Sequence, residues 1–144
     1  MSQPSNSRPA VALVIGIADY KHTDRIAPLR YASDDARSLA RLLADPQVCR
    51  FPRKRVALLT EKRARRDKVV HYLSKWLPEK AQGAELALIY FAGHGVVQKV
   101  GNREEGYLLP YDADPKDVVT RGVAMSDLGR YIDGIAASAV IVWS

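Results

Sequence analysis

His94 stands between two glycines at the end of an apolar run, a setting that suits a histidine exchanging protons with a substrate. Seven consecutive apolar residues, 86–92, precede the turn Gly93-His94-Gly95. A short apolar run bounded by glycine is typical of a strand buried on both faces of a parallel sheet. Reacting groups in such sheets gather beyond the carboxyl ends of the strands, where flanking glycines let the backbone approach a substrate closely. The alternative is a histidine that only closes the strand with a backbone hydrogen bond.

Cys49 is the single cysteine of the chain and the second residue with reactive chemistry. One cysteine excludes an intrachain disulfide framework and a cysteine-rich zinc site. It also agrees with a reducing compartment, so we expect a cytoplasmic protein. No histidine neighbours Cys49 in sequence, and its surroundings therefore indicate a loop cysteine rather than a catalytic nucleophile.

Length and composition indicate one globular domain. The chain has 144 residues, and 47% of them are hydrophobic, which is enough for a substantial core. No apolar run approaches the ~20 residues that cross a bilayer, so we expect no membrane partner. Residues 1–9 are polar and lack the apolar region of a signal peptide, and we interpret them as a flexible N-terminal tail.

Basic residues are concentrated between Arg50 and Lys68 and contribute to a net charge of +6. Such a cluster can bind nucleic acid, but Phe51 is its only aromatic residue and no recognised nucleic-acid motif accompanies it. We therefore interpret the cluster as a solvated basic face and do not expect nucleic acid as a partner.

The first part of the chain alternates apolar runs with amphipathic stretches. The spacing predicts strands at 11–17, 56–60 and 85–91, and it predicts helices at 31–44 and 64–77. Ser33 and Asp34 are expected to start the first helix, and Pro78 and Gly83 to close the second. Strands that alternate with helices are typical of a parallel sheet covered by helices on both faces.

The remaining part contains weaker signals. We interpret residues 98–106 as a polar loop and Tyr107–Pro110 as a short edge strand, because proline is confined to strand ends or sheet edges. The three acidic residues within 111–117 do not match a calcium loop and favour a turn. Ser126 is a candidate helix cap, and residues 139–143 predict a fourth buried strand.

Four of these segments together resemble the caspase-like peptidases of the C14 group, most closely the bacterial and metacaspase-type members. The segments are ALVIGIADY, LRYASDDARSLARLL, LALIYFAGHG and GYLLPYDA, and a final apolar strand follows them. One such motif would be weak evidence, whereas four in the family's order and spacing are specific. The resemblance covers Val11 to Ser144 and implies a caspase-like domain over residues 10–144. The implied fold is a three-layer α/β fold, in which helices flank a mostly parallel sheet.

The resemblance also implies a cysteine endopeptidase with a His–Cys dyad. His94 matches the catalytic histidine, which transfers a proton to the leaving amine, and Gly95 matches the donor of an oxyanion-hole N–H. Asp35 matches the acidic residue that selects Arg or Lys before the scissile bond in metacaspase-type members. Asp19, in the polar loop after the first strand, is the second candidate for substrate binding. From the residues alone, Asp35 or its neighbour Asp34 could instead be a first-turn carboxylate stabilised by the helix dipole.

The nucleophile of such a dyad is absent from its expected place. In caspases the histidine lies ~50 residues before the cysteine. In the family the fourth strand runs into Asp-Ala-Cys-Xaa-Gly, whereas this sequence reaches Ser144 at that point. A terminal serine lacks the fixed turn that aims a nucleophile. We expect a piece of a longer protease or a processed subunit whose partner carries the cysteine, before a natural pseudoenzyme. We also expect a sheet that is incomplete after its fourth core strand, and no activity from this chain alone.

Two functions from different classes follow. The first is proteolysis of peptide or protein substrates after Arg or Lys, without a cofactor, and calcium regulation cannot be read from these residues. The second is a non-catalytic, pseudo-caspase module that binds peptides or partner domains.

Overall fold

A four-stranded parallel sheet forms the centre of the computed structural model, which describes residues 9–143. Its strands are β1 (Val11–Gly16), β2 (Val56–Thr60), β3 (Ala87–Ala92) and β7 (Val140–Trp143), in the order β2-β1-β3-β7. All neighbouring pairs are parallel, and Gly16 pairs with both Thr60 and Ala92. The predicted strands are therefore confirmed to within two residues. The proposed N-terminal tail lies, apart from Pro9, outside the described residues.

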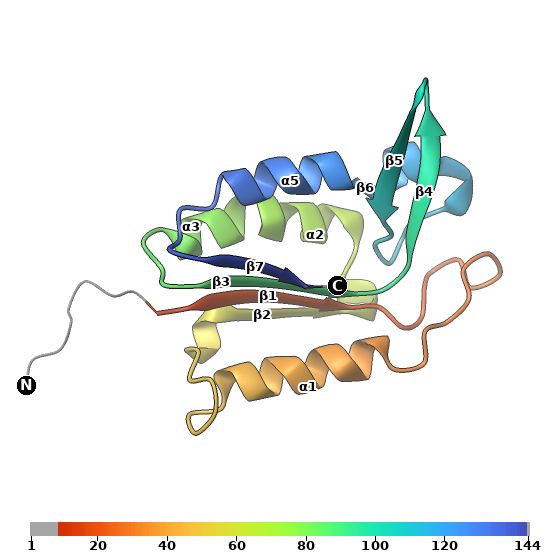
Figure 1. Cartoon of the computed structure of the whole chain (residues 1–144). Helices are drawn as coiled ribbons and strands as arrows, with labels where there is room; N and C mark the ends of the chain where they lie inside the picture. The colour runs from red at the N-terminus through yellow and green to blue at the C-terminus, as the bar shows by residue number, and fades with distance from the viewer. Residues whose placement is uncertain (1–8, 144) are drawn as a thin grey trace, which may run out of the picture.

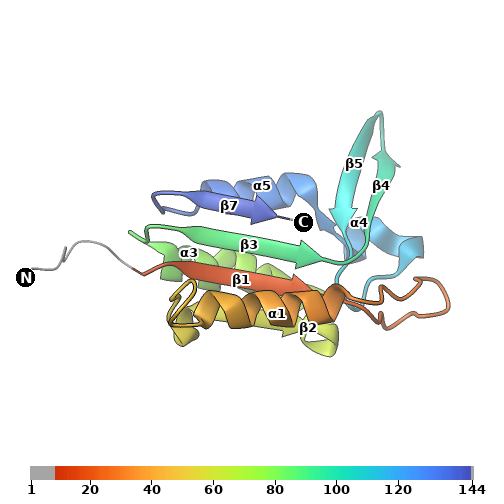
Figure 2. The same ribbon diagram turned by 60° about the horizontal axis from the view of Figure 1, so that its bottom comes forward.

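Helices cover both faces of this sheet, as the alternating pattern predicted (Figures 1 and 2). Helix α1 (Ala32–Ala44) packs on one face, where Ala12 and Val14 of β1 belong to the same core cluster as Ala36. Helices α2 (Arg66–His71), α3 (Leu77–Ala81) and α5 (Met125–Asp133) lie on the other face. Because successive residues of a strand point to opposite faces, a fully buried β1 supplies side chains to both layers.

The second predicted helix continues past Pro78 to Ala81, so the prediction for Pro78 was wrong, whereas Gly83, with a φ of +72°, lies just beyond the end of the helix as expected. A π-helical turn, η3 (Tyr72–Trp76), joins α2 to α3, and the N–H of Leu77 donates to the carbonyl of Tyr72. Pro78 then falls in the first turn of α3, where its missing N–H is not needed. The wide turn therefore allows the chain to continue as a helix past the proline.

A small antiparallel sheet occupies the segment that we expected to be a loop and an edge strand. Its strands are β4 (Gly95–Val100), β5 (Arg103–Leu108) and β6 (Val123–Ala124), in the order β4-β5-β6. The missed signal is the two-residue turn Gly101-Asn102, whose glycine has a φ of +64°. Because the strands carry charged residues on an exposed hairpin, hydrophobic alternation did not reveal them. Tyr107 and Leu108 therefore lie in the central strand of this sheet.

Short helical segments complete the chain. They are η1 (Arg53–Arg55), η2 (Glu61–Arg63), η4 (Pro115–Asp117) and α4 (Val118–Arg121). Within residues 9–143 no helix combines the length and the apolar character that a bilayer crossing requires.

The two predicted serine caps do not act as caps. Helix α1 starts at Ala32 without a side-chain cap, and Ser33 is buried in its first turn. Helix α5 starts at Met125, and the Ser126 hydroxyl donates to a carboxylate oxygen of Glu105 at 2.6 Å. Packing against the sheets, rather than capping, therefore decides where these two helices begin.

The first turn of α1 is seated directly on the end of β1. A Cβ atom at Gly16 would lie 2.4 Å from the Cβ of Ala36 and 2.5 Å from the carbonyl oxygen of Ala32. No side chain fits in that space without moving the helix. Glycine at this position therefore sets how closely the helix approaches the carboxyl edge of the sheet.

We predict that Gly16→Ala lowers the free energy of unfolding by about 1–3 kcal/mol, because the added methyl group overpacks the contact between α1 and β1. Gly129→Ala is the matched control, because a Cβ atom there meets nothing within 4 Å and the residue lies in α5. In this control the free energy of unfolding should rise by about 0.5–1 kcal/mol, because alanine is a better helix former than glycine. Urea denaturation of both variants measures this, and equal stabilities would contradict the close seating of α1.

Candidate active site

His94 lies at the carboxyl edge of the parallel sheet, between the end of β3 and the start of β4. Strand β1 ends at the same edge, because Gly16 pairs with Ala92. Strand β7 also runs toward this edge, and its residue Trp143 pairs with Tyr90. This is the location predicted for His94, while its role in catalysis stays a prediction.

The hydroxyl of Tyr20 holds the backbone on both sides of the turn at His94. It accepts the N–H of His94 at 2.8 Å and donates to the carbonyl oxygen of Leu109 at 2.9 Å. The N–H of Leu109 donates in turn to the carbonyl oxygen of His94 at 2.9 Å. The Tyr20 hydroxyl therefore bridges the N–H of His94 and the carbonyl of Leu109, in place of a direct hydrogen bond between them. Tyr20 is only 2% exposed. Sequence reasoning did not single out Tyr20, although it follows a buried strand directly.

The absence of a side chain at Gly93 allows the Tyr20 hydroxyl to lie close to the backbone before His94. A Cβ atom at Gly93 would lie 2.8 Å from that hydroxyl oxygen and 2.8 Å from a ring carbon of Phe91. A larger residue would push the hydroxyl away from the N–H of His94. The glycine before the histidine is therefore required by close packing.

A backbone carbonyl orients the imidazole of His94. The Nε2 atom lies 2.7 Å from the carbonyl oxygen of Ala27, and the half-buried ring packs 5.5 Å from the ring of Tyr20 between centroids. A carbonyl oxygen only accepts hydrogen bonds, so Nε2 carries the proton. In the neutral ring Nδ1 is then the acceptor. The geometry therefore provides a histidine of defined tautomer with one basic nitrogen.

The loop over residues 17–31 supplies that carbonyl, and the chain around it holds it in place. The N–H of Leu29 donates to the carbonyl of Ala18 at 2.8 Å, and the N–H of Lys21 donates to that of Tyr111 at 3.0 Å. The Glu61 carboxylate accepts the N–H of Ala18 at 2.8 Å. Glu61 itself has a φ of +50°, a conformation that non-glycine residues rarely adopt. Glu61, the first residue of η2 directly after β2, therefore adopts a strained backbone conformation where it anchors the loop that follows β1.

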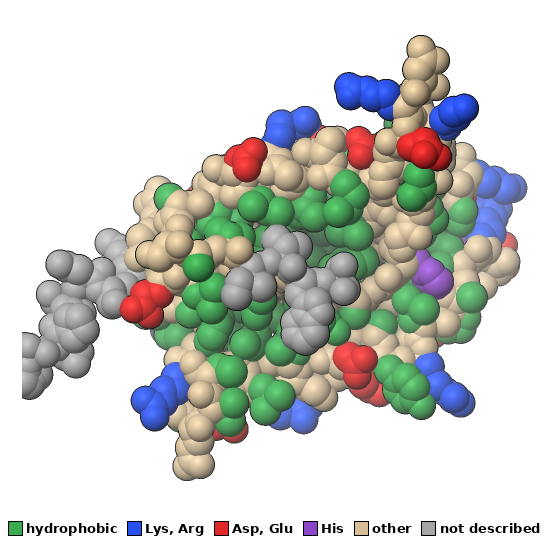
Figure 3. Space-filling view, in the orientation of Figure 1, with side chains coloured by type: hydrophobic (Ala, Val, Ile, Leu, Met, Phe, Trp, Pro, Cys, Tyr) green, Lys and Arg blue, Asp and Glu red, His purple; other side chains and the backbone are tan. Residues whose placement is uncertain are grey.

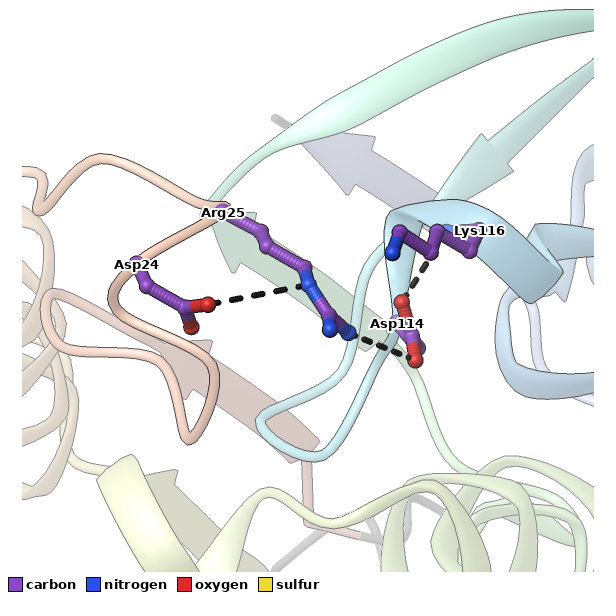
Figure 4. A network of polar contacts seen from close by, with 4 residues as sticks. All are labelled: Asp24, Arg25, Asp114 and Lys116. Atoms are coloured by element: carbon purple, nitrogen blue, oxygen red, sulfur yellow. Dashed lines mark hydrogen bonds and ion pairs between the residues drawn. The ribbon is translucent and has the colours of Figure 1, made fainter.

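An ion pair ties the same loop to the segment after β5 (Figure 4). Arg25 donates to Asp114 at 3.1 Å, and Asp24 lies 3.7 Å from the other side of its guanidinium. The backbone N–H of Lys116 donates to the second oxygen of Asp114 at 3.0 Å. This N–H, aided by Arg25, lowers the pKa of Asp114. The acidic residues in 111–117 therefore include one that organises a turn and braces the loop.

Asp35 and Asp19 both lie near the same edge and are exposed. Asp35 is in the first turn of α1, and burial, followed by the charge of Asp35, raises the pKa of the Tyr90 phenol in β3. Asp34 instead pairs with Arg37 at 3.2 Å. Asp19 follows β1 closely, and its N–H donates to Glu61 at 3.3 Å. The structure therefore brings both candidate substrate-binding carboxylates to the region around the strand ends.

The N–H of Gly95 points away from the small sheet. Residues His94 and Leu109 form a hydrogen-bonded pair, and bonded pairs alternate with non-bonded pairs in an antiparallel ladder. The next pair, Gly95 with Leu108, is then a non-bonded one. Because β4 is an edge strand, this N–H faces outward beside His94. Such a donor can approach a developing negative charge on a bound carbonyl oxygen.

Cys49 lies at the opposite edge of the sheet. It is exposed in the connection between the end of α1 and the start of β2. Val56, the first residue of β2, pairs with Ala12 near the start of β1. The structure therefore does not bring Cys49 to His94.

We predict that Tyr20→Phe destabilises the protein by about 1–3 kcal/mol near pH 8, because the N–H of His94 and the carbonyl of Leu109 lose their buried partner. Burial raises the pKa of Tyr20 to about 12. The unfolded chain releases this proton near its ordinary pKa of about 10, so the stabilisation is complete below pH 10 and disappears as the pH rises toward 12.

Urea denaturation between pH 8 and pH 12 measures this difference, which should shrink at the alkaline end. Tyr31→Phe, the same change at a residue that is 62% exposed, is the control and should have little effect. A constant difference between wild type and Tyr20→Phe over this pH range would contradict the proposed role of the buried hydroxyl.

Comparisons with known proteins agree with this architecture. Protein GSU0716 from Geobacter sulfurreducens, known from a crystal structure, superposes with a TM-score of 0.70 at 18% sequence identity. The alignment covers 95% of this chain and 49% of that protein, so the chain spans about half the length of this solved relative. At this identity the likeness concerns the fold alone.

No curated protein matches the chain in sequence. The model of the caspase domain family, peptidase C14, matches residues 9–142. The resemblance drawn from the sequence motifs is therefore confirmed at the level of the family. Because this match covers nearly all of the sequence, the chain belongs to the caspase domain family of C14 peptidases.

Proposed function

We propose that this chain is the histidine-bearing part of a caspase-type cysteine endopeptidase that cleaves peptides after Arg or Lys. The observation that carries the proposal is the contact of 2.7 Å between Nε2 of His94 and the carbonyl of Ala27. It leaves Nδ1 as the nitrogen that can accept a proton. A histidine serving only to close a strand has no need of a fixed tautomer.

In the proposed mechanism, Nδ1 of His94 takes the proton of a cysteine thiol, and the thiolate attacks the scissile carbonyl carbon. The N–H of Gly95 donates to the oxygen as it becomes negative. His94 then gives its proton to the leaving amine, which leaves a thioester on the cysteine. Water, deprotonated by His94, hydrolyses the thioester and restores the thiol.

We place the thiol outside these residues, because Cys49 is at the wrong edge of the sheet. Strand β7 runs parallel to β3 and pairs Trp143 with Tyr90, four residues before His94. A segment that continued β7 would emerge at the edge that carries His94. The cysteine is supplied there, either by such a segment or by a partner chain.

Asp35 is the proposed partner of a basic side chain before the scissile bond. It is exposed near the carboxyl edge, while its neighbour Asp34 is paired with Arg37. A carboxylate pairs with a guanidinium through two parallel hydrogen bonds, which gives strength and a defined geometry. Asp19 adds a second negative charge on the neighbouring loop.

We predict that His94→Ala abolishes peptide cleavage by a form of the protein that contains the cysteine, because the proton carrier is lost. His71→Ala is the matched control, since His71 is exposed at the end of α2, and Cys49→Ala should likewise retain activity. The assay measures kcat/KM on fluorogenic peptides. Cleavage that survives His94→Ala, or that disappears in Cys49→Ala, would overturn the assignment. Peptide binding without any cleavage would favour the non-catalytic interaction module.

We predict that Asp35→Ala lowers kcat/KM roughly 30- to 1000-fold for peptides with Arg or Lys before the scissile bond, because the variant loses the charged contact that Asp35 makes with the bound basic side chain. Asp34→Ala should change it little, because this carboxylate pairs with Arg37 on the helix surface. A wild-type preference for Asp at this position would contradict the proposed specificity. An unchanged preference for Arg in Asp35→Ala would leave Asp35 as a helix-start residue only.

A further inference from the structure

A small apolar slot lies on one face of the hairpin sheet, immediately beside Gly95. We call it the hairpin slot and define it by Gly95, Val97, Gly106, Leu108 and Met125. Val97 pairs with Gly106 across the β4–β5 ladder. Tyr107 pairs with Ala124 in β6, so Met125 follows next to Gly106 on the other side. Strands β4 and β5 and the first residue of α5 thus place a valine, a glycine and a methionine side by side.

The slot exists because the middle of this row has no side chain. Val97 lies directly across the ladder from Gly106, and the side chain of Met125 lies next to Gly106 on its other side, so these two side chains form the walls of the slot. A Cβ atom at Gly106 would lie 3.1 Å from Cγ of Met125, and Gly95 leaves a second gap on the same face. The cavity measures about 260 Å³, which suits one or two amino-acid side chains.

The walls of the slot are apolar and open to solvent. Val97 is 68% exposed and Met125 is 45% exposed, and the lining contains no charged residue. Charged residues lie farther along the hairpin, where Lys99 pairs with Glu104. Figure 3 shows the same trend, with charged side chains near the tip of the hairpin and hydrophobic ones at its base. Covering exposed apolar surface of this kind with another apolar group is favourable in free energy.

The slot lies on the opposite side of the parallel sheet from Asp35. Helix α1, which carries Asp35, covers one face, and the hairpin rises on the side of α5 (Figure 1). In the proposed function, the basic side chain lies at Asp35 and the scissile carbonyl lies at Gly95, which also borders the slot. The slot is then next to the position of the residues that follow the scissile bond.

We propose that the hairpin slot binds an apolar side chain, such as leucine, from one of the first two residues after the scissile bond. This inference rests on the proposed function, because it uses Gly95 as the oxyanion donor and Asp35 as the site of the basic residue. The flexible thioether of Met125 adapts its position above Gly106 to the bound side chain. The site therefore selects peptides with a basic residue followed by apolar ones.

Binding can be measured on this chain without cleavage. Met125 and Met1 are its only two methionines, so a sample labelled with [methyl-13C]methionine gives two signals, which Met125→Leu assigns. The probes are the peptides acetyl-Ala-Ala-Arg-Leu-Leu-Gly-amide and acetyl-Ala-Ala-Arg-Ser-Ser-Gly-amide. The leucine peptide should shift the Met125 methyl signal and bind about tenfold more tightly than the serine peptide, a ratio that corresponds to 1.4 kcal/mol.

Two variants change the slot and one tests the hairpin as a whole. Gly106→Val fills the slot and Val97→Ser removes the apolar character of one wall, so both should abolish the preference for leucine. Val100→Ser is the control, because Val100 is 43% exposed on the opposite face of β4 and should keep the preference. Equal binding of the two peptides, or a preference that survives both slot variants, would overturn the proposal.

The test separates this inference from the proposed protease activity. A Met125 shift confined to the leucine peptide supports the slot. If a form of the protein that contains the cysteine nevertheless cleaves no peptide, the protease proposal alone fails. If the peptides are cleaved after Arg at the same rate whatever residues follow, and the Met125 signal does not shift, the slot proposal is overturned and the protease proposal stands.

Discussion

The hydroxyl of Tyr20 connects three parts of the molecule through two hydrogen bonds. From the loop after β1, this hydroxyl accepts a hydrogen bond from the N–H of His94 at 2.8 Å and donates one to the carbonyl oxygen of Leu109 at 2.9 Å. The parallel sheet, the hairpin sheet and the β1 loop therefore meet at one buried oxygen. An unsatisfied N–H or carbonyl at such a depth costs about 1–3 kcal/mol, so these parts are coupled in stability. The position of the candidate catalytic histidine depends on this coupling.

The chemistry of His94 is set by a segment remote in sequence. The carbonyl of Ala27 accepts a hydrogen bond from Nε2 and so determines which ring nitrogen carries the proton. The loop that contains Ala27 is held in turn by its contacts with Glu61, Tyr111 and Asp114. The contact between the N–H of Lys21 and the carbonyl of Tyr111 joins two backbone groups and therefore does not depend on a side-chain conformation. A base oriented in this way requires no acidic side chain beside it. The loop between β1 and α1 is thus part of the candidate site as much as the turn after β3.

The elements predicted correctly from sequence are those whose local pattern and tertiary role agree. Residues 11–17 and 85–91 are apolar without interruption because both faces of their strands are covered, so their pattern has one interpretation. The hairpin at 95–108 was missed because only one of its faces is partly covered and its strands carry Lys99, Arg103 and Glu104. The predicted helix end at Pro78 was wrong for a related reason. The π-helical turn that precedes Pro78 leaves no recognisable pattern in the local sequence.

The sequence by itself determined the family, the parallel sheet and the place of His94 and Gly95 at a strand end, because buried strands and glycine turns leave strong local patterns. Only the tertiary structure decided which groups surround His94. Tyr20 and Ala27 lie 74 and 67 residues away along the chain, and nothing in their local sequence marks a hydrogen-bond partner. The same holds for the hairpin slot, whose walls come from β4 and the start of α5. Periodicity records which faces a segment buries, whereas contacts between distant segments arise only when the strands are ordered and paired.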